Sequence, residues 1–206
     1  MSRVDGPVPR AEVEAMAVRT LLWPRAEDAL AGHPAHLISA ALDGAERPLD
    51  AAHALTRIIG AVAAGVRVAG AYWASADQLV QPSRLIEAAM AEQPPVEVWL
   101  GMMPFQGDPS QGWAAGSFGV LTRGLGALAG YELMRDAMAT GGALEPVLEE
   151  VWGLARYLLA TGAALEAGQV IDGLPGGKVR VEAAARPDER GTPVLRLARV
   201  AAGADA

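Results

Sequence analysis

The chain has 206 residues, with 17 basic and 24 acidic side chains, a formal net charge of −7 and no cysteine. The absence of thiols excludes disulfides, cysteine nucleophiles and cysteine-ligated metal centres. The acidic balance repels phosphate backbones, so a nucleic-acid partner is not expected.

The first 25 residues carry acids and bases throughout, which is not the pattern of a secretory signal. The most apolar stretch, Ala51 to Val66, is interrupted by His53 and Arg57 and is shorter than the ~20 residues of a membrane helix. We therefore expect a cytoplasmic protein with no membrane partner.

Two short helical patterns precede residue 32 and predict an N-terminal helical arm over residues 1–31. His36 to Leu42 is an apolar run of strand length, Leu49 to Ala64 has helical spacing, and Val66 to Trp73 again resembles a strand. The three segments predict a β-α-β unit with parallel strands. The large apolar residues of the helix share one third of its wheel and are expected to face the core: Leu55, Ile58, Ile59, Val62 and Val66.

The middle of the chain alternates between turn signals and short periodic segments. Pro82 to Glu92 is predicted to be a helix and Val96 to Met103 a strand, because Pro94-Pro95 separates them. Ala115 to Thr122 is predicted to be the next strand, antiparallel to the one before it. A glycine-rich turn follows, and Tyr131 to Ala139 is expected to be a short helix.

The last third contains the strongest helical pattern, Leu144 to Thr161, which is expected to bury one stripe of leucine, valine and alanine. Glu149 and Glu150 near its start are expected to be solvated, in a turn that favours acids. Lys178 to Ala184 and Pro193 to Val200 alternate and predict a hairpin. Residues 201–206 are expected to be a disordered tail.

These segments predict one α+β domain over residues 32–200. We expect a two-layer sandwich with a mixed sheet of about six strands and helices mainly on one face.

The candidate chemistry is sparse. The three histidines lie between residues 33 and 53, but the odd offset of His33 and His36 sends them to opposite faces of a strand, and no acid completes a helical metal motif. No serine lies in a G-x-S-x-G turn, and the run around Gly124 matches no phosphate-binding loop. We therefore predict no catalytic residue, no metal and no cofactor.

Two further residues have unusual positions. Trp73 ends a predicted parallel strand, where open sheets place their crevices. Arg57 lies on the helix face opposite the apolar stripe, beside His53, Gly60 and Ala64. Because exposed helix faces normally carry several charges, this face is predicted to be covered by the N-terminal arm or by a second chain, with Arg57 partly buried.

Motifs spread from about residue 7 to residue 200 resemble a bacterial domain family of unknown function, number 4261. They are Trp23-Pro24, His33-Pro34-Ala35-His36, Leu55-Thr56-Arg57-Ile58-Ile59, Tyr72-Trp73, Leu121-Thr122-Arg123-Gly124-Leu125 and Ala155-Arg156-Tyr157-Leu158. The resemblance supports the fold outline and implies no activity.

The sequence favours a non-enzymatic protein-interaction module, such as an immunity or accessory protein of a bacterial toxin or secretion system. Its partner is expected to be another protein or a second copy of the chain. The alternative is a small-molecule or metal-dependent enzyme that uses the region of His33, His36 and Arg57. The binding candidates are His33, His36, His53, Arg57, Trp73 and Thr122.

Overall fold

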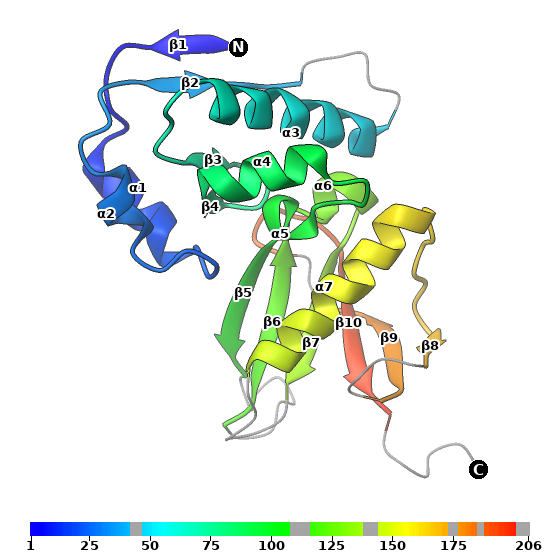
Figure 1. The fold of residues 1–206 in the computed structure, drawn as a ribbon. Helices are drawn as coiled ribbons and strands as arrows, with labels where there is room; N and C mark the ends of the chain where they lie inside the picture. Colours follow the sequence, from blue (N-terminus) through cyan, green and yellow to red (C-terminus); the bar gives the residue numbers. More distant parts are fainter. Residues whose placement is uncertain (42–46, 108–115, 138–143, 173–176, 185–187, 201–206) are drawn as a thin grey trace. The chain divides into compact units, whose positions relative to one another are not determined.

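The computed structural model describes residues 1–41, 47–107, 116–137, 144–172, 177–184 and 188–200 (Figure 1). Its internal contacts divide the chain into two compact units, Met1–Gly101 and Met102–Ala206. The division into an arm, one domain and a tail stays a prediction, and residues 201–206 lie outside the described residues.

The described part of the first unit contains short strands and five helices, in the order β1 (Ser2–Val4), α1 (Arg10–Val18), α2 (Ala26–Leu30), β2 (His36–Ile38), α3 (Pro48–Gly65), β3 (Ala71–Trp73), β4 (Gln78–Val80), α4 (Pro82–Met90) and α5 (Val96–Trp99). Two antiparallel pairs form, β1 with β2 and β3 with β4. A small core joins α1, α2 and β4 through Val13, Ala26, Leu30 and Leu79. Trp23 packs against this core.

The expected parallel β-α-β unit is wrong. Within the described residues, β2 pairs with β1 and β3 pairs with β4. Only Ala71–Trp73 of the expected strand is extended, and a tight turn then returns the chain, with Asp77 at φ 52°. A hairpin partner this close in sequence supplies the hydrogen bonds of β3 without a crossover.

The strand expected from Val96 is also wrong at its start. Val96–Trp99 forms α5, and β5 begins at Gly101. The Pro95 carbonyl accepts the N–H of Val98 at 2.9 Å, which closes a helical turn directly after the proline pair. The buried Gln78 amide then caps the end of α5 by donating to three carbonyl oxygens, those of Glu97, Val98 and Leu100, at 2.9–3.2 Å.

Helices α3 and α4 lie side by side (Figure 1). The residues that α3 buries are Ala52, Thr56 and Gly60. A Cβ atom at Gly60 would lie 2.3 Å from the Ala89 Cβ, so the two helices approach at backbone distance. The predicted core stripe is therefore wrong: none of its members is fully buried, and Ile58 and Val66 are 52% and 57% exposed. The buried face is centred about 100° further round the helix, at Thr56.

The second unit is built on one mixed sheet. Its strands are β5 (Gly101–Gln106), β6 (Phe118–Arg123), β7 (Glu132–Ala137), β8 (Val170–Ile171), β9 (Val179–Ala183) and β10 (Val194–Arg199), in the order β5-β6-β7-β10-β9-β8. β7 and β10 are parallel, whereas β6–β7, β9–β10 and β8–β9 are antiparallel. The expected α+β class with a mixed sheet of six strands is confirmed, and so is the hairpin of β9 and β10.

Helix α7 (Leu144–Thr161) contacts β6 and β7 across one face of this sheet (Figure 1). Its bounds match the prediction. The predicted stripe is buried except for its first member, Leu144, which is partly exposed; the buried members are Leu148, Val151, Leu154, Ala155, Leu158 and Leu159. Gly162 ends the helix with φ 70°, a conformation that glycine adopts without strain.

The helix expected over Tyr131 to Ala139 is wrong, because Glu132–Ala137 is β7. β7 lies between β6 and β10, so both of its edges are hydrogen-bonded. This central position outweighs the helical propensity of a short Leu- and Met-containing segment. The connection before it, expected to be a turn, contains the short helix α6 (Gly126–Ala129).

Candidate interaction face and buried polar networks

His33 and His36 hold the N-terminal segment in place. The Val8 N–H donates to His33 Nε2 at 2.8 Å, and His33 Nδ1 contacts the Leu30 carbonyl at 2.7 Å. The proton of the neutral ring is therefore on Nδ1, and both ring nitrogens are engaged. His36 Nδ1 contacts the Gly6 carbonyl at 3.0 Å. The two residues lie on neighbouring segments, and each binds backbone.

His53 lies on α3 and belongs to a cluster of side chains with Trp99 and Thr56. Its ring meets the ring of Trp99 edge-on, with centroids 4.7 Å apart. Trp99 is fully buried and its Nε1–H donates to Thr56 Oγ1 at 2.8 Å, while that hydroxyl donates to the Ala52 carbonyl at 2.7 Å. Burial lowers the pKa of His53, and the positive charge of Arg57 lowers it further. His53 is thus a packing residue whose surroundings favour the neutral ring.

Arg57 lies on the part of α3 that faces solvent. We define the outer face of α3 as the exposed residues within about 120° of its wheel: Asp50, Ala54, Arg57, Ile58, Ala61, Ala64 and Gly65. The expected partly buried Arg57 is wrong for the single chain, because Arg57 and Ala64 are exposed. Gly60 packs against α4 and not against the N-terminal arm, and cover by a second chain stays a prediction.

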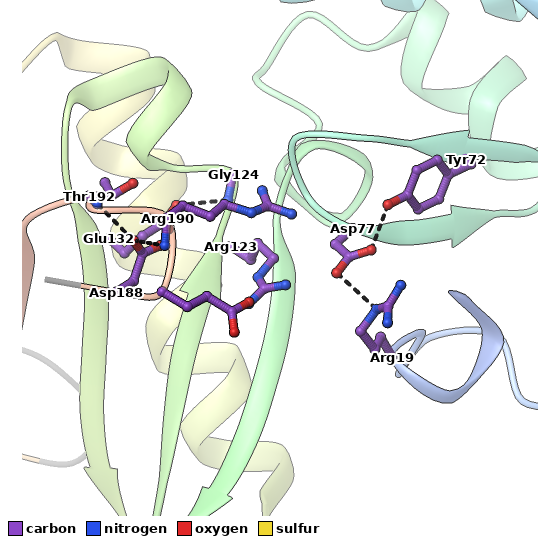
Figure 2. A network of polar contacts seen from close by, with 10 residues as sticks. Arg19, Tyr72, Asp77, Arg123, Gly124, Glu132, Asp188, Arg190 and Thr192 are labelled. Carbon is purple, nitrogen blue, oxygen red and sulfur yellow. Dashed lines mark hydrogen bonds and ion pairs between the residues drawn. The ribbon is translucent and has the colours of Figure 1, made fainter. Parts of the chain in front are cut away.

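Trp73 is buried at the end of β3, opposite Gln78 in the hairpin register. The crevice argument for Trp73 fails, because β3 is antiparallel to its partner. Beside it, the buried Asp77 accepts the Tyr72 hydroxyl at 2.6 Å and pairs with Arg19 Nε at 2.8 Å (Figure 2). This network closes the hairpin turn and connects it to the end of α1.

Thr122 is part of a buried carboxylate site in the second unit. Its hydroxyl donates to Glu132 Oε2 at 2.6 Å and accepts the Leu133 N–H at 2.8 Å. Glu132 also accepts the backbone N–H groups of Gly124, Leu125 and Gly126 at 2.9–3.2 Å. Figure 2 shows Glu132 beside Gly124. The glycine turn is therefore an anion nest that the chain's own glutamate fills.

Burial raises the pKa of Glu132, and the four hydrogen bonds that the carboxylate accepts oppose this rise. A Cβ atom at Gly126 would lie 2.4 Å from Thr192 Cγ2 and 3.1 Å from Glu132 Oε1. The turn thus needs glycine for close packing against both the carboxylate and the β9–β10 connection.

A buried ion pair joins α7 to the sheet. Arg135 Nε on β7 lies 2.5 Å from Glu150 Oε1, and the two side chains are 1% and 4% exposed. Arg135 Nη1 also donates to the Leu197 carbonyl on β10 at 3.0 Å. The expectation of a solvated Glu150 is therefore wrong, although its neighbour Glu149 is exposed.

A second arginine, Arg123, pairs with Glu189 in the connection between β9 and β10. Asp188 orders that connection, because its Oδ1 accepts the N–H groups of Arg190 and Thr192 at 2.9 and 2.7 Å (Figure 2). The charged groups at this end of the sheet thus fix loops to strands.

Glu132, Glu150 and Asp77 were absent from the sequence-based candidates, because each is recognisable only from partners distant in sequence. A weak signal exists for Glu132, since an acid soon after Gly124-Leu125-Gly126 is a candidate to fill a nest.

Within the described part of the chain, no cluster of three or more histidine, aspartate or glutamate side chains has the arrangement of a metal site. In the same part, no helix combines the length and apolar character required to span a membrane.

No protein family matches the chain, and no curated protein matches it. The resemblance to family 4261 therefore stays a prediction.

Proposed function

We propose that this chain is a non-enzymatic protein-interaction module whose contact surface is the outer face of α3. The observation that carries the proposal is the chemistry of that face. The face carries two charges, Asp50 near its start and Arg57, while its other members are alanine, glycine and isoleucine, and Ile58 is 52% exposed. Solvent-facing helix surfaces normally carry several charges, so a face this apolar is typical of a contact surface.

The polar networks support the same proposal. Buried acids and arginines are paired with each other or with backbone: Asp77 with Arg19, Glu132 with the nest, Glu150 with Arg135. These contacts stabilise strands, turns and α7. His33 and His36 bind the N-terminal segment, and among the described contacts neither joins Arg57.

We further propose that the partner is a protein whose activity this chain masks, as an immunity or accessory protein of a toxin or secretion system does. The support is the net charge of −7, which suits association with a basic partner.

The test is purification of the tagged chain from its source organism, with mass spectrometry to identify proteins recovered in stoichiometric amount. Each identified protein is then purified and titrated by calorimetry against the wild type, Ala61→Glu on the outer face and Ala160→Glu on α7. Both alanines are exposed on helices, so the second variant is a matched control. We expect Ala61→Glu to weaken binding at least tenfold and Ala160→Glu to leave it unchanged. Equal binding by all three chains would contradict the proposal.

A further inference from the structure

The outer face of α3 carries two opposite charges on the same side of the helix, Asp50 near its start and Arg57 two turns later. Seven residues at 100° each bring Arg57 to within about 20° of Asp50 on the wheel. Between them lies Ala54, whose small side chain allows another backbone to approach. Arg57 has no ion pair or hydrogen bond among the described residues.

This arrangement is self-complementary. When two copies of α3 cross antiparallel with the two-fold axis between His53 and Ala54, Asp50 of each copy lies opposite Arg57 of the other. Two-fold symmetric interfaces require this reciprocity, because each residue that contacts its counterpart does so twice.

The existing contact of Asp50 is compatible with the pairing. Arg47 Nε and Nη2 already donate to the two oxygens of Asp50 at 3.0 Å each. A carboxylate has about four acceptor positions, so a second arginine has room.

The net charge of −7 opposes self-association, so a contact between two copies is favoured where the surface has no excess of negative charge. The outer face meets this condition, since Asp50 is already matched by Arg47, Arg57 is positive, and its other residues are alanine, glycine and isoleucine.

We infer that, when no partner protein is bound, the outer face of α3 is occupied by a second copy of this chain, paired antiparallel through α3 and held by two reciprocal Asp50–Arg57 ion pairs. The inference rests on the proposed function in that it takes the same face as a contact surface. One helix pair buries less than the ~1,200 Å² of a standard interface, so the dimer is weak and forms at micromolar or higher concentration.

The experiment is sedimentation equilibrium of the full-length chain from about 1 µM to about 500 µM, without any partner present. Four chains are compared: wild type, Arg57→Asp, Asp50→Arg and the control Arg84→Asp. Arg84 is exposed on α4, outside the proposed contact. We expect the wild type and the control to dimerise with equal Kd, and each of the other two variants alone to dimerise at least tenfold more weakly.

The decisive measurement is an equimolar mixture of Arg57→Asp and Asp50→Arg. In the mixed dimer one copy supplies two acids and the other two arginines, so both ion pairs are restored. We expect the mixture to dimerise within about threefold of the wild-type Kd. Local unfolding of the variants cannot explain dimerisation that returns when the two chains are mixed. Circular dichroism of each variant checks independently that it is folded.

A wild-type chain that stays monomeric up to 500 µM would overturn the inference. So would a dimer that all four chains form equally, since its contact would lie elsewhere. A mixture that stays monomeric would do the same. In each case the proposed function is judged separately, by whether an identified partner protein distinguishes Ala61→Glu from Ala160→Glu.

Discussion

Helices α3 and α7 have the same length, 18 residues, and both carry a stripe of large apolar residues, yet they use it differently. α7 buries its stripe against the sheet. α3 instead buries a row of small residues, Ala52, Thr56 and Gly60, and leaves Ile58 half-exposed. An apolar stripe is therefore good evidence that a segment is helical, but weaker evidence of which face of the helix is buried.

Two local demands explain the orientation of α3. Gly60 allows α4 to approach more closely than any larger residue would permit. Trp99 is buried and needs an acceptor for its Nε1–H, which Thr56 supplies at 2.8 Å. On α7, by contrast, the Nε1–H of the buried Trp152 has no acceptor in the described part of the chain. The orientation of α7 follows from burial of its apolar stripe, whereas the orientation of α3 follows from close packing and one hydrogen bond.

The largest effect is expected at the buried ion pair of α7. Glu150→Ala leaves Arg135 charged and buried without its partner, which costs about 3–5 kcal/mol of unfolding free energy. The neighbouring Glu149→Ala removes an exposed acid of the same helix and should stay within about 0.5 kcal/mol. Urea denaturation of both variants measures the difference. Similar midpoints for the two would show that the pair does not hold α7 to the sheet.

The next effect tests the close approach of α3 and α4. Gly60→Ala places a methyl group 2.3 Å from the Ala89 Cβ and should destabilise the first unit by about 1–3 kcal/mol. Gly65→Ala, at the end of the same helix, meets open space and should be neutral or slightly stabilising, because alanine favours helices. A Gly60→Ala chain as stable as Gly65→Ala would mean that the helices can separate without loss.

The sequence predicted the elements that show a periodic pattern over many residues and the strands whose pairing partner is next in the chain. α7 and the β9–β10 hairpin fall into this group, and α3 does so in its bounds. It failed at β7, α5 and the pairing of β3, because these short segments take their conformation from neighbours. β7 is fixed by strands on both sides, and α5 by the amide of Gln78.

Of the candidate residues, Arg57 was named because it is the only charge between Asp50 and Arg67 in the sequence, and its role stays a prediction. Thr122 was named through a resemblance, and its contact with Glu132 required the structure. Glu150 could not be distinguished from Glu149 in the sequence. Which of two neighbouring positions on a helix is buried depends on how the helix packs against the sheet.

A further change tests the hydrogen bond that orients α3. Thr56→Val keeps the shape of the side chain but leaves the Trp99 Nε1–H buried without an acceptor, which costs about 1–3 kcal/mol. Thr56→Ser retains the hydroxyl and should lose less. Urea midpoints of the two variants test this. If the valine variant is at least as stable as the serine variant, the Trp99–Thr56 hydrogen bond does not stabilise the orientation of α3.

A smaller effect is expected from pH. Because the folded-state pKa of His53 is lowered, the unfolded chain binds more protons just below the ordinary histidine pKa of about 6.5. The stability contribution is therefore present above that pH and is lost as the pH falls through the folded-state pKa. His53→Gln should flatten this part of the pH profile, and an NMR titration should place the His53 pKa below that of an unfolded histidine. A pKa above 6.5 would contradict the packing of His53 described above.

The smallest effect is expected at Arg57, on the outer face of α3. Arg57 is exposed, so Arg57→Ala at about 1 µM should change the unfolding free energy by no more than about 0.5 kcal/mol, as Arg84→Ala on α4 should. At some hundreds of micromolar the wild type gains stability by mass action if its outer face is occupied, whereas Arg57→Ala gains less. Urea midpoints at the two concentrations separate these contributions. A loss above about 1 kcal/mol at the low concentration would give Arg57 a role within the single chain, and the outer face of α3 would then be part of the fold.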